Sequence, residues 1–375
     1  MSNGNVRSKD KVTAGSNRHE FGYIDCDIHH NVPNIEAIFP YLPRKYKEQI
    51  EIFGDGIPKQ ISTMNGGMNG RRVDSFPPSG KHSGSDERFL AAQHLDYYNI
   101  KYGILTGDFA YATYTPDLEY SAALCSAFND YTIEHWIEKD ERYRGSIYIP
   151  TNDSAAAVKE IERLGPHPKM VQVYAPAGAR APYGQKVYHP IFEACVKHNL
   201  PFTLHVGCEG MGVNPPPTGA GYPSHYIEYR SLRPQIYMAH MASLIFEGVF
   251  DLFPDLQVVF LEGGVFWMAP YLWRLDTDWI GLRHQTPWVK KKPSEYFQTN
   301  ISVGSQPIEK APNHPLFLLM MESIYANERL LFCSDYPHWD FDSPKLALPK
   351  LDKELAANVY YNNAARLYGL PLVQP

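Results

Sequence analysis

Residues 23–30 read YIDCDIHH, a run that begins as an apolar strand and ends in acidic and imidazole side chains. Side chains at positions i and i+2 of a strand point to the same face. Asp27 and His29 are therefore expected to point together into one space, with Asp25 one step below them on the same face. A buried strand whose last residues are polar and reactive is typical of a parallel barrel, where the chemistry lies at the C-terminal ends of the strands.

Seven more short apolar runs follow, and stretches with helical periodicity such as 117–139 and 188–198 separate them. This alternation predicts parallel βαβ units, and eight such units most simply close into an α/β fold of the (β/α)8 TIM-barrel type. A doubly wound open sheet is the alternative, but no glycine-rich phosphate loop follows the first strand. The strands are predicted at 23–29, 102–106, 145–149, 170–174, 202–206, 257–261, 297–301 and 330–334.

The predicted domain organisation is simple: a flexible N-terminal tail over 1–20 and one barrel over 21–370. Two loop insertions rich in glycine and proline, 54–86 and 207–224, interrupt the alternation. Long loops of this kind are usually lids or substrate loops, and a loop that contacts another subunit is the alternative.

Composition excludes several classes of function. The net charge is −6 and no basic block appears, so nucleic acid is not expected as a partner. No apolar run reaches the roughly 20 residues needed to span a bilayer, and the N-terminus lacks a signal peptide, so no membrane is expected. The 5 cysteines are scattered without a CxxC pair, which indicates reduced thiols in a cytoplasmic enzyme.

Three other predicted strands also end in side chains that bind metals: His205, Glu262 and Asp335. A single histidine or aspartate at a strand end is more often structural. Several at matching ends of barrel strands indicate a metal site, because these ends meet at one mouth. The predicted ligands are Asp27, His29, His205 and Asp335, with Glu262 and His338 as further candidates.

These motifs resemble the amidohydrolase-2 branch of the amidohydrolase superfamily, which includes aminocarboxymuconate-semialdehyde and hydroxybenzoate decarboxylases. The resemblance covers about residues 21–370 and would imply a metal-dependent barrel enzyme. It rests on the opening Ile24-Asp25-Cys26-Asp27-Ile28-His29, on His205, on the segment 248–259 (GVFDLFPDLQVV), on Glu262-Gly263-Gly264 with Pro270-Tyr271-Leu272, on Ser334-Asp335-Tyr336-Pro337 and on the closing 363–369 (NAARLYG).

Two positions depart from the family pattern, because Asp27 and Glu262 each stand where the family has a histidine. Carboxylates make the site harder, so Mn or Fe is expected to fit at least as well as Zn. Glu262 is a candidate general base, a metal ligand, or a bridge to a second ion that His338 or His240 would bind. Because a nearby cation lowers a carboxylate's pKa, we expect Glu262 to coordinate metal rather than to shuttle protons freely.

The predicted reaction is hydrolysis or non-oxidative decarboxylation of a small, carboxylated substrate, with Glu262 or Asp335 moving the proton, and His240 as a further catalytic candidate. Arg180 and Arg230, with Arg233 beside them, are candidates to clamp the substrate carboxylate. One alternative is a dinuclear Fe or Mn monooxygenase on the same barrel, and another is a non-catalytic partner of a related enzyme. A homo-oligomer, or a hetero-oligomer with a related barrel subunit, is expected.

Overall fold

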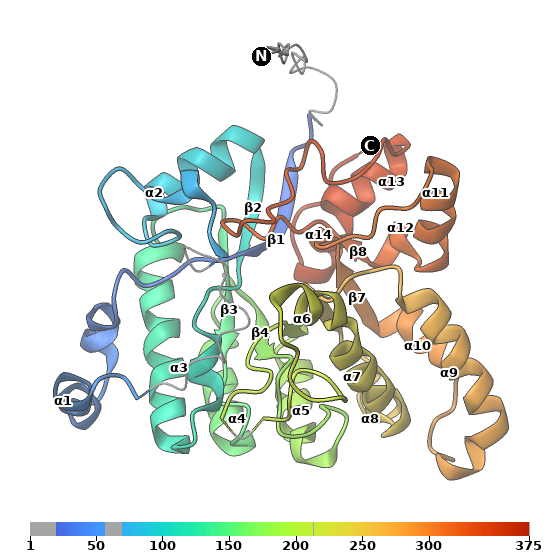
Figure 1. The fold of residues 1–375 in the computed structure, drawn as a ribbon, viewed down its shortest axis with the longest axis horizontal. Helices are drawn as coiled ribbons and strands as arrows, with labels where there is room; N and C mark the ends of the chain where they lie inside the picture. The colour runs from blue at the N-terminus through green and yellow to red at the C-terminus, as the bar shows by residue number, and fades with distance from the viewer. Residues whose placement is uncertain (1–19, 57–69, 213, 375) are drawn as a thin grey trace, which may run out of the picture.

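The computed structural model describes residues 20–56, 70–212 and 214–374 of the chain. Eight strands form one sheet in sequence order, and each strand pairs in parallel with the next. Figure 1 shows the helices arranged around these strands. The strands are β1 (Tyr23–Ile28), β2 (Ile100–Leu105), β3 (Tyr143–Tyr148), β4 (Met170–Pro176), β5 (Phe202–His205), β6 (Val258–Leu261), β7 (Ile301–Gly304) and β8 (Leu330–Leu331).

Helices fill every connection between successive strands, so the predicted (β/α)8 barrel is confirmed. They are α1 (Arg44–Phe53), α2 (Glu87–Leu90), α3 (Leu118–Thr132), α4 (Ser154–Leu164), α5 (His189–Lys197), α6 (Tyr226–Leu232), α7 (Pro234–Phe246), α8 (Val249–Leu252), α9 (Met268–Leu282), α10 (Pro293–Asn300), α11 (His314–Ser323), α12 (Ala326–Arg329), α13 (Lys353–Ala357) and α14 (Asn363–Tyr368).

Main-chain hydrogen bonds bring the last strand back to the first. The Cys26 amide donates to the Phe332 carbonyl at 2.9 Å, and the His29 amide donates to the Tyr336 carbonyl at 2.7 Å. The residues that follow β8 therefore run beside β1 and nearly close the barrel. This closure places the ends of β1 and β8 next to each other.

A buried polar layer lies below the strand ends. The Gln172 side chain donates to Ser146 and accepts from Thr203 and from Tyr368 of α14, each at 2.8 Å. Because these partners satisfy Gln172, its burial carries little penalty. The layer ties β3, β4 and β5 to the C-terminal helix and supports the residues above it.

The predicted seventh strand is wrong, because residues 297–300 belong to α10 and β7 begins only at Ile301. Pro293 occupies the first turn of α10, and the Glu295 carboxylate accepts from the Lys292 amide at 2.8 Å. Both features are typical of a helix start. They outweigh the strand preference of Tyr296 and Phe297. Both side chains are buried, but they lie on the buried side of a helix and not in a strand.

Part of the 54–86 insertion is anchored over the barrel mouth. The Arg72 amide donates to the Pro337 carbonyl at 3.0 Å, and the Trp339 amide donates to the Gly70 carbonyl at 2.7 Å. Residues 70–72 thus pair with the loop that follows β8. The centre of this insertion, 57–69, and all but the last residue of the predicted tail lie outside the described residues. Within the described residues, no helix combines the length and the apolar character that crossing a bilayer requires.

Candidate metal centre

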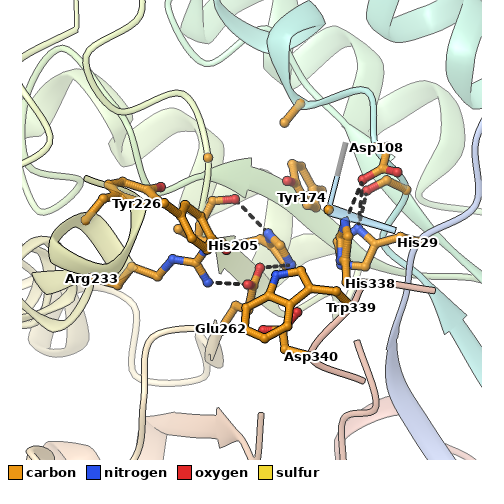
Figure 2. A pocket seen from close by; sticks show the side chains of 16 residues that line it. His29, Asp108, Tyr174, His205, Tyr226, Arg233, Glu262, His338, Trp339 and Asp340 are labelled. Atoms are coloured by element: carbon orange, nitrogen blue, oxygen red, sulfur yellow. Dashed lines mark hydrogen bonds and ion pairs between the residues drawn. The ribbon is translucent and has the colours of Figure 1, made fainter. Parts of the chain in front are cut away.

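The ends of β1, β5, β6 and β8 bring the predicted ligands together at one mouth. Asp27 is the penultimate residue of β1 and His29 follows that strand, while His205 is the last residue of β5. Glu262 comes directly after β6, and Asp335 lies four residues beyond β8. All five side chains are buried. Figure 2 shows His205 beside Glu262, and His29 beside His338. The His29 and His205 rings are in contact, with centroids 4.9 Å apart.

Each neighbouring pair of these side chains has the separation expected of two ligands of one ion. Asp27 lies 3.4 Å from His29 Nε2 and 3.3 Å from His205 Nε2. Asp335 lies 3.1 Å from His29 Nε2, and Glu262 lies 3.4 Å from His205 Nε2. Two atoms that each bind a metal at about 2.1 Å are roughly 3.0–3.4 Å apart at octahedral to tetrahedral angles. The cluster therefore has the spacing of a metal centre.

Two of these residues have left-handed backbone conformations. Glu262 and Asp335 each have a φ of 58°. This region is uncommon for residues other than glycine and is found in turns and at functional sites. The sharp turn at each strand end directs the carboxylate back toward the mouth.

Hydrogen bonds fix the orientation of both imidazoles. His29 Nδ1 lies 2.9 Å from the Gly107 carbonyl, and His205 Nδ1 lies 2.8 Å from the Val206 carbonyl. Since a carbonyl only accepts, each Nδ1 carries a proton, and each Nε2 is the atom that can bind either a second proton or a metal ion. Histidines that bind metals have this arrangement.

Four ligand-type atoms at the centre have no hydrogen-bond partner, although each is buried: Asp27 Oδ2, His29 Nε2, His205 Nε2 and Asp335 Oδ2. Buried polar atoms are almost always satisfied, so these unpartnered atoms indicate a cation site. Ligand atoms of Asp27, His29 and His205 lie within 4.8 Å of one another, and so do those of His29, Asp335 and His338. The electrostatics agree. Burial alone would lower the pKa of His29, but the carboxylates of Asp27 and Asp335 outweigh it and raise that pKa to about 9. The cluster thus favours positive charge at its centre, and its residues fit a divalent metal.

Residues around the cluster hold the ligands in place. The Thr106 hydroxyl donates to Asp27 Oδ1 at 2.6 Å, and Asp108 lies 3.1 Å from His29 Nδ1. The imidazole of His338 is hydrogen-bonded through Nδ1 to Asp335, which leaves only its Nε2 for a metal. Asp25 does not enter the cluster: it bonds His94 at 2.6 Å and the Ser334 hydroxyl at 2.5 Å, which ties β1 to the loop after β8.

Three arginines pair with acidic residues around the mouth. Arg233 donates to Glu262 Oε1, Arg230 lies 2.5 Å from Asp340, and Arg71 pairs with Asp108. The Nε and Nη1 groups of Arg71 are buried without a hydrogen-bond partner among the described residues. Arg71 therefore has free donors next to Asp108, which lines the pocket described below, although Arg71 itself is not among the residues that line it.

A pocket of about 210 Å³ opens above the cluster. This volume lies below the roughly 300–1,000 Å³ of pockets for drug-sized ligands, which points to a small substrate. Aromatic side chains form much of its wall: Tyr174, Tyr226, Tyr229 and Trp339.

Two predicted site residues lie elsewhere. His240 Nε2 donates to the Ala177 carbonyl at 2.8 Å, and its Nδ1 accepts from the Tyr183 amide at 3.2 Å. With both nitrogens used by the main chain, His240 is a structural residue, and its predicted catalytic or metal role is wrong. Arg180 is exposed and lines a different pocket with His240, so it does not clamp a substrate at this cluster.

The sequence interpretation missed Thr106, Asp108 and Arg71. Thr106 and Asp108 follow β2 directly, so the strand-end rule that found His205 could have found them. Arg71 lies far along the insertion after β1, and no periodic pattern indicated that its segment returns to the mouth.

Comparison with known proteins identifies the family. The sequence profile of the amidohydrolase family matches residues 24–370. The chain belongs to the amidohydrolase family. The family predicted from the motifs is thereby confirmed.

Among its relatives, a γ-resorcylate decarboxylase from Rhodococcus jostii is 25% identical over 258 residues, which are 65% of this chain and 75% of that protein. A crystal structure of dihydroxybenzoic acid decarboxylase from Polaromonas sp. JS666, with bound manganese and the inhibitor 2-nitroresorcinol, has a TM-score of 0.62 at 19% identity and covers 93% of this amidohydrolase and 97% of that chain. For 5-carboxyvanillate decarboxylase from Sphingomonas paucimobilis the TM-score is 0.64 at 19% identity, over 93% and 99% of the two chains.

Proposed function

We propose that this amidohydrolase is a metal-dependent, non-oxidative decarboxylase of small aromatic carboxylic acids. The observation that carries the proposal is the set of four buried, unpartnered ligand atoms on Asp27, His29, His205 and Asp335. The relatives support decarboxylation over hydrolysis, since they are decarboxylases of γ-resorcylate, dihydroxybenzoic acid and 5-carboxyvanillate.

Charge and ligand type favour a single divalent ion, with Mn²⁺ ahead of Zn²⁺. Arginines neutralise the carboxylates of Asp108, Asp340 and Glu262. The carboxylates of Asp27 and Asp335 remain, and their two negative charges match one divalent cation. A set of carboxylates and imidazoles suits Mn²⁺ and Fe²⁺ as well as Zn²⁺. The Polaromonas relative carries manganese. Glu262 is proposed as a fifth ligand through Oε2, as the sequence predicted.

The same geometry argues against the dinuclear monooxygenase. A bridging glutamate needs one oxygen for each ion, but Arg233 holds Glu262 Oε1. Displacing Arg233 would leave a buried guanidinium without its carboxylate, which is costly. In addition, none of the three relatives named above is an oxygenase.

Residues of this chain would bind and convert the substrate as follows. The free donors of Arg71 bind an anionic oxygen of the substrate. A bound divalent ion would supply Lewis-acid polarisation of substrate oxygens. The bond between the ring and the carboxylate breaks, carbon dioxide leaves, and the electron pair stays on the ring carbon. Glu262 or Asp335, once its carboxylate has taken up a proton from solvent, would deliver that proton to the ring carbon and return to the anionic form.

Three wider sequence predictions are also proposals. We propose that residues 21–370 act as one barrel unit, that the protein is an oligomer with itself or with a related barrel subunit, and that it works in the cytoplasm. Sedimentation of the purified protein, alone and mixed with a related barrel subunit, tests the second of these. A monomer in both samples would contradict it.

The test of the function combines metal analysis with product detection. Protein from manganese-supplemented cells is expected to hold about one ion per chain and to release carbon dioxide from 2,6-dihydroxybenzoate or 5-carboxyvanillate without consuming dioxygen. The Asp335→Asn variant is expected to lose both the metal and the activity, because it removes one of the two uncompensated charges. Asp278→Asn, an exposed acid paired with Arg274, is the matched control. Full metal content without carbon dioxide release from either acid would contradict the proposal.

A further inference from the structure

An exposed indole stands at the mouth of the metal pocket. Trp339 lines the pocket, yet 54% of its surface is exposed. Figure 2 shows the indole in front of Glu262 and Asp340. A large apolar side chain left in water beside a binding pocket gains stability when a ligand covers it, so its position needs a functional explanation.

The indole is held in place by its surroundings. The main-chain amide of Trp339 donates a hydrogen bond to the Gly70 carbonyl at 2.7 Å. The Arg230 guanidinium lies 5.3 Å from the ring centroid, within cation–π range, and Asp340 in turn holds Arg230 at 2.5 Å. Because both the backbone and a neighbouring charge restrain Trp339, little conformational freedom would be lost when a ligand packs on it.

A second aromatic ring lies in edge-to-face contact with the indole at the mouth. Tyr226 begins α6, and its ring centroid lies 6.4 Å from that of Trp339 at an interplanar angle of 68°. The Tyr226 hydroxyl accepts from Arg233 Nη2 at 3.4 Å, so Arg233 joins this ring to Glu262. Both rings are thereby tied to the polar network around the proposed metal.

We propose that Trp339 and Tyr226 form an aromatic clamp, in which the two rings meet at a steep angle and the ring of the substrate packs into the corner between them, so that the pocket selects planar aromatic acids over aliphatic acids of similar size. This inference rests on the proposed function and names the residues that set its substrate class. Aromatic rings in offset-stacked or edge-to-face contact attract each other beyond the effect of buried area. A saturated ring lacks the flat π-face and gains only the area.

The test compares ligands that differ in planarity and aromaticity. Affinities of the manganese-loaded protein are measured by calorimetry for 2,6-dihydroxybenzoate and for the matched pair benzoate and cyclohexanecarboxylate. Trp339→Leu is expected to bind both aromatic acids roughly tenfold more weakly and to bind cyclohexanecarboxylate about as the unmodified protein does. Trp339→Phe is expected to restore most of the aromatic affinity. Metal content should not change in either variant.

Trp273→Leu is the matched control, since Trp273 is 60% exposed on α9 and does not line the pocket. Equal losses for benzoate and cyclohexanecarboxylate in Trp339→Leu, or no loss for either, would overturn the clamp while leaving the decarboxylase proposal intact. Failure of the unmodified, metal-loaded protein to bind any of the aromatic acids would overturn both proposals.

Discussion

The hydrogen bond from Thr106 to Asp27 offers a direct test of the metal centre. Thr106 is fully buried, and its hydroxyl donates to Asp27 Oδ1 at 2.6 Å. The Thr106→Val variant removes this donor with little change in shape. A hydrogen bond to a charged group contributes about 1.5–3 kcal/mol. At about 1.4 kcal/mol for each factor of ten, the variant should bind Mn²⁺ roughly 10- to 100-fold more weakly.

The assay is a competition titration of Mn²⁺ against a chelator, followed by thermal unfolding with and without the ion. Stabilisation by a ligand depends on its concentration relative to the dissociation constant, so the shift in Tm with Mn²⁺ should shrink. Thr106→Ser keeps the hydroxyl and should bind normally. Thr113→Val is the matched control, because its equally buried hydroxyl bonds the Ala110 carbonyl at 2.6 Å.

A Thr106→Val protein that binds Mn²⁺ as tightly as the unmodified chain would refute the reasoning. So would a Thr113→Val protein that loses as much affinity, because the effect would then come from general loosening of the fold.

Three other predictions concern the mouth and the fold. Arg71→Gln should raise KM for 2,6-dihydroxybenzoate roughly 10- to 100-fold through loss of a charge-assisted hydrogen bond, with metal content unchanged; an unchanged KM would remove Arg71 from substrate binding. Glu262→Gln should lower metal affinity if Oε2 is a ligand, and unchanged metal content with a lost limb in the pH–rate profile would restore the general-base interpretation. Burial lowers the pKa of His240 from 6.5 to about 4. The unfolded chain therefore takes up the proton first, and stability should fall by about 3 kcal/mol as the pH drops from 6.5 to 4; urea unfolding should show a smaller fall in His240→Gln.

The fold was predictable because its signal is local and repeated. A short apolar run followed by a helical stretch identifies each unit without knowledge of the rest. The prediction of the seventh strand failed because apolar and aromatic residues occur both in buried strands and on the buried side of helices. The proline and glutamate at 293 and 295 were the decisive signals, and they outweighed the composition of the run.

The site was predictable where chemistry coincides with a strand end. Strand alternation and parallel closure were enough to bring Asp27, His29, His205 and Asp335 together. The predicted role of His240 was wrong because residue type alone does not show whether an imidazole faces the mouth or the main chain behind it. Arg71 was missed because its position depends on long-range pairing of two loops, which no local pattern encodes.

The Glu262–Arg233 pair also bears on how this family can exchange ligands. The motif resemblance predicts a histidine where Glu262 stands, and a neutral imidazole carries no charge. A glutamate bound to Arg233 likewise adds no net charge, so the two residues together substitute for one imidazole. Replacing the histidine with a glutamate therefore depends on having an arginine at position 233, and changing either residue alone would alter the charge at the site. A chain that reverts only Glu262 to histidine would bury an unmatched guanidinium beside a cation, so restoring the family's ligand should also require a neutral residue at position 233.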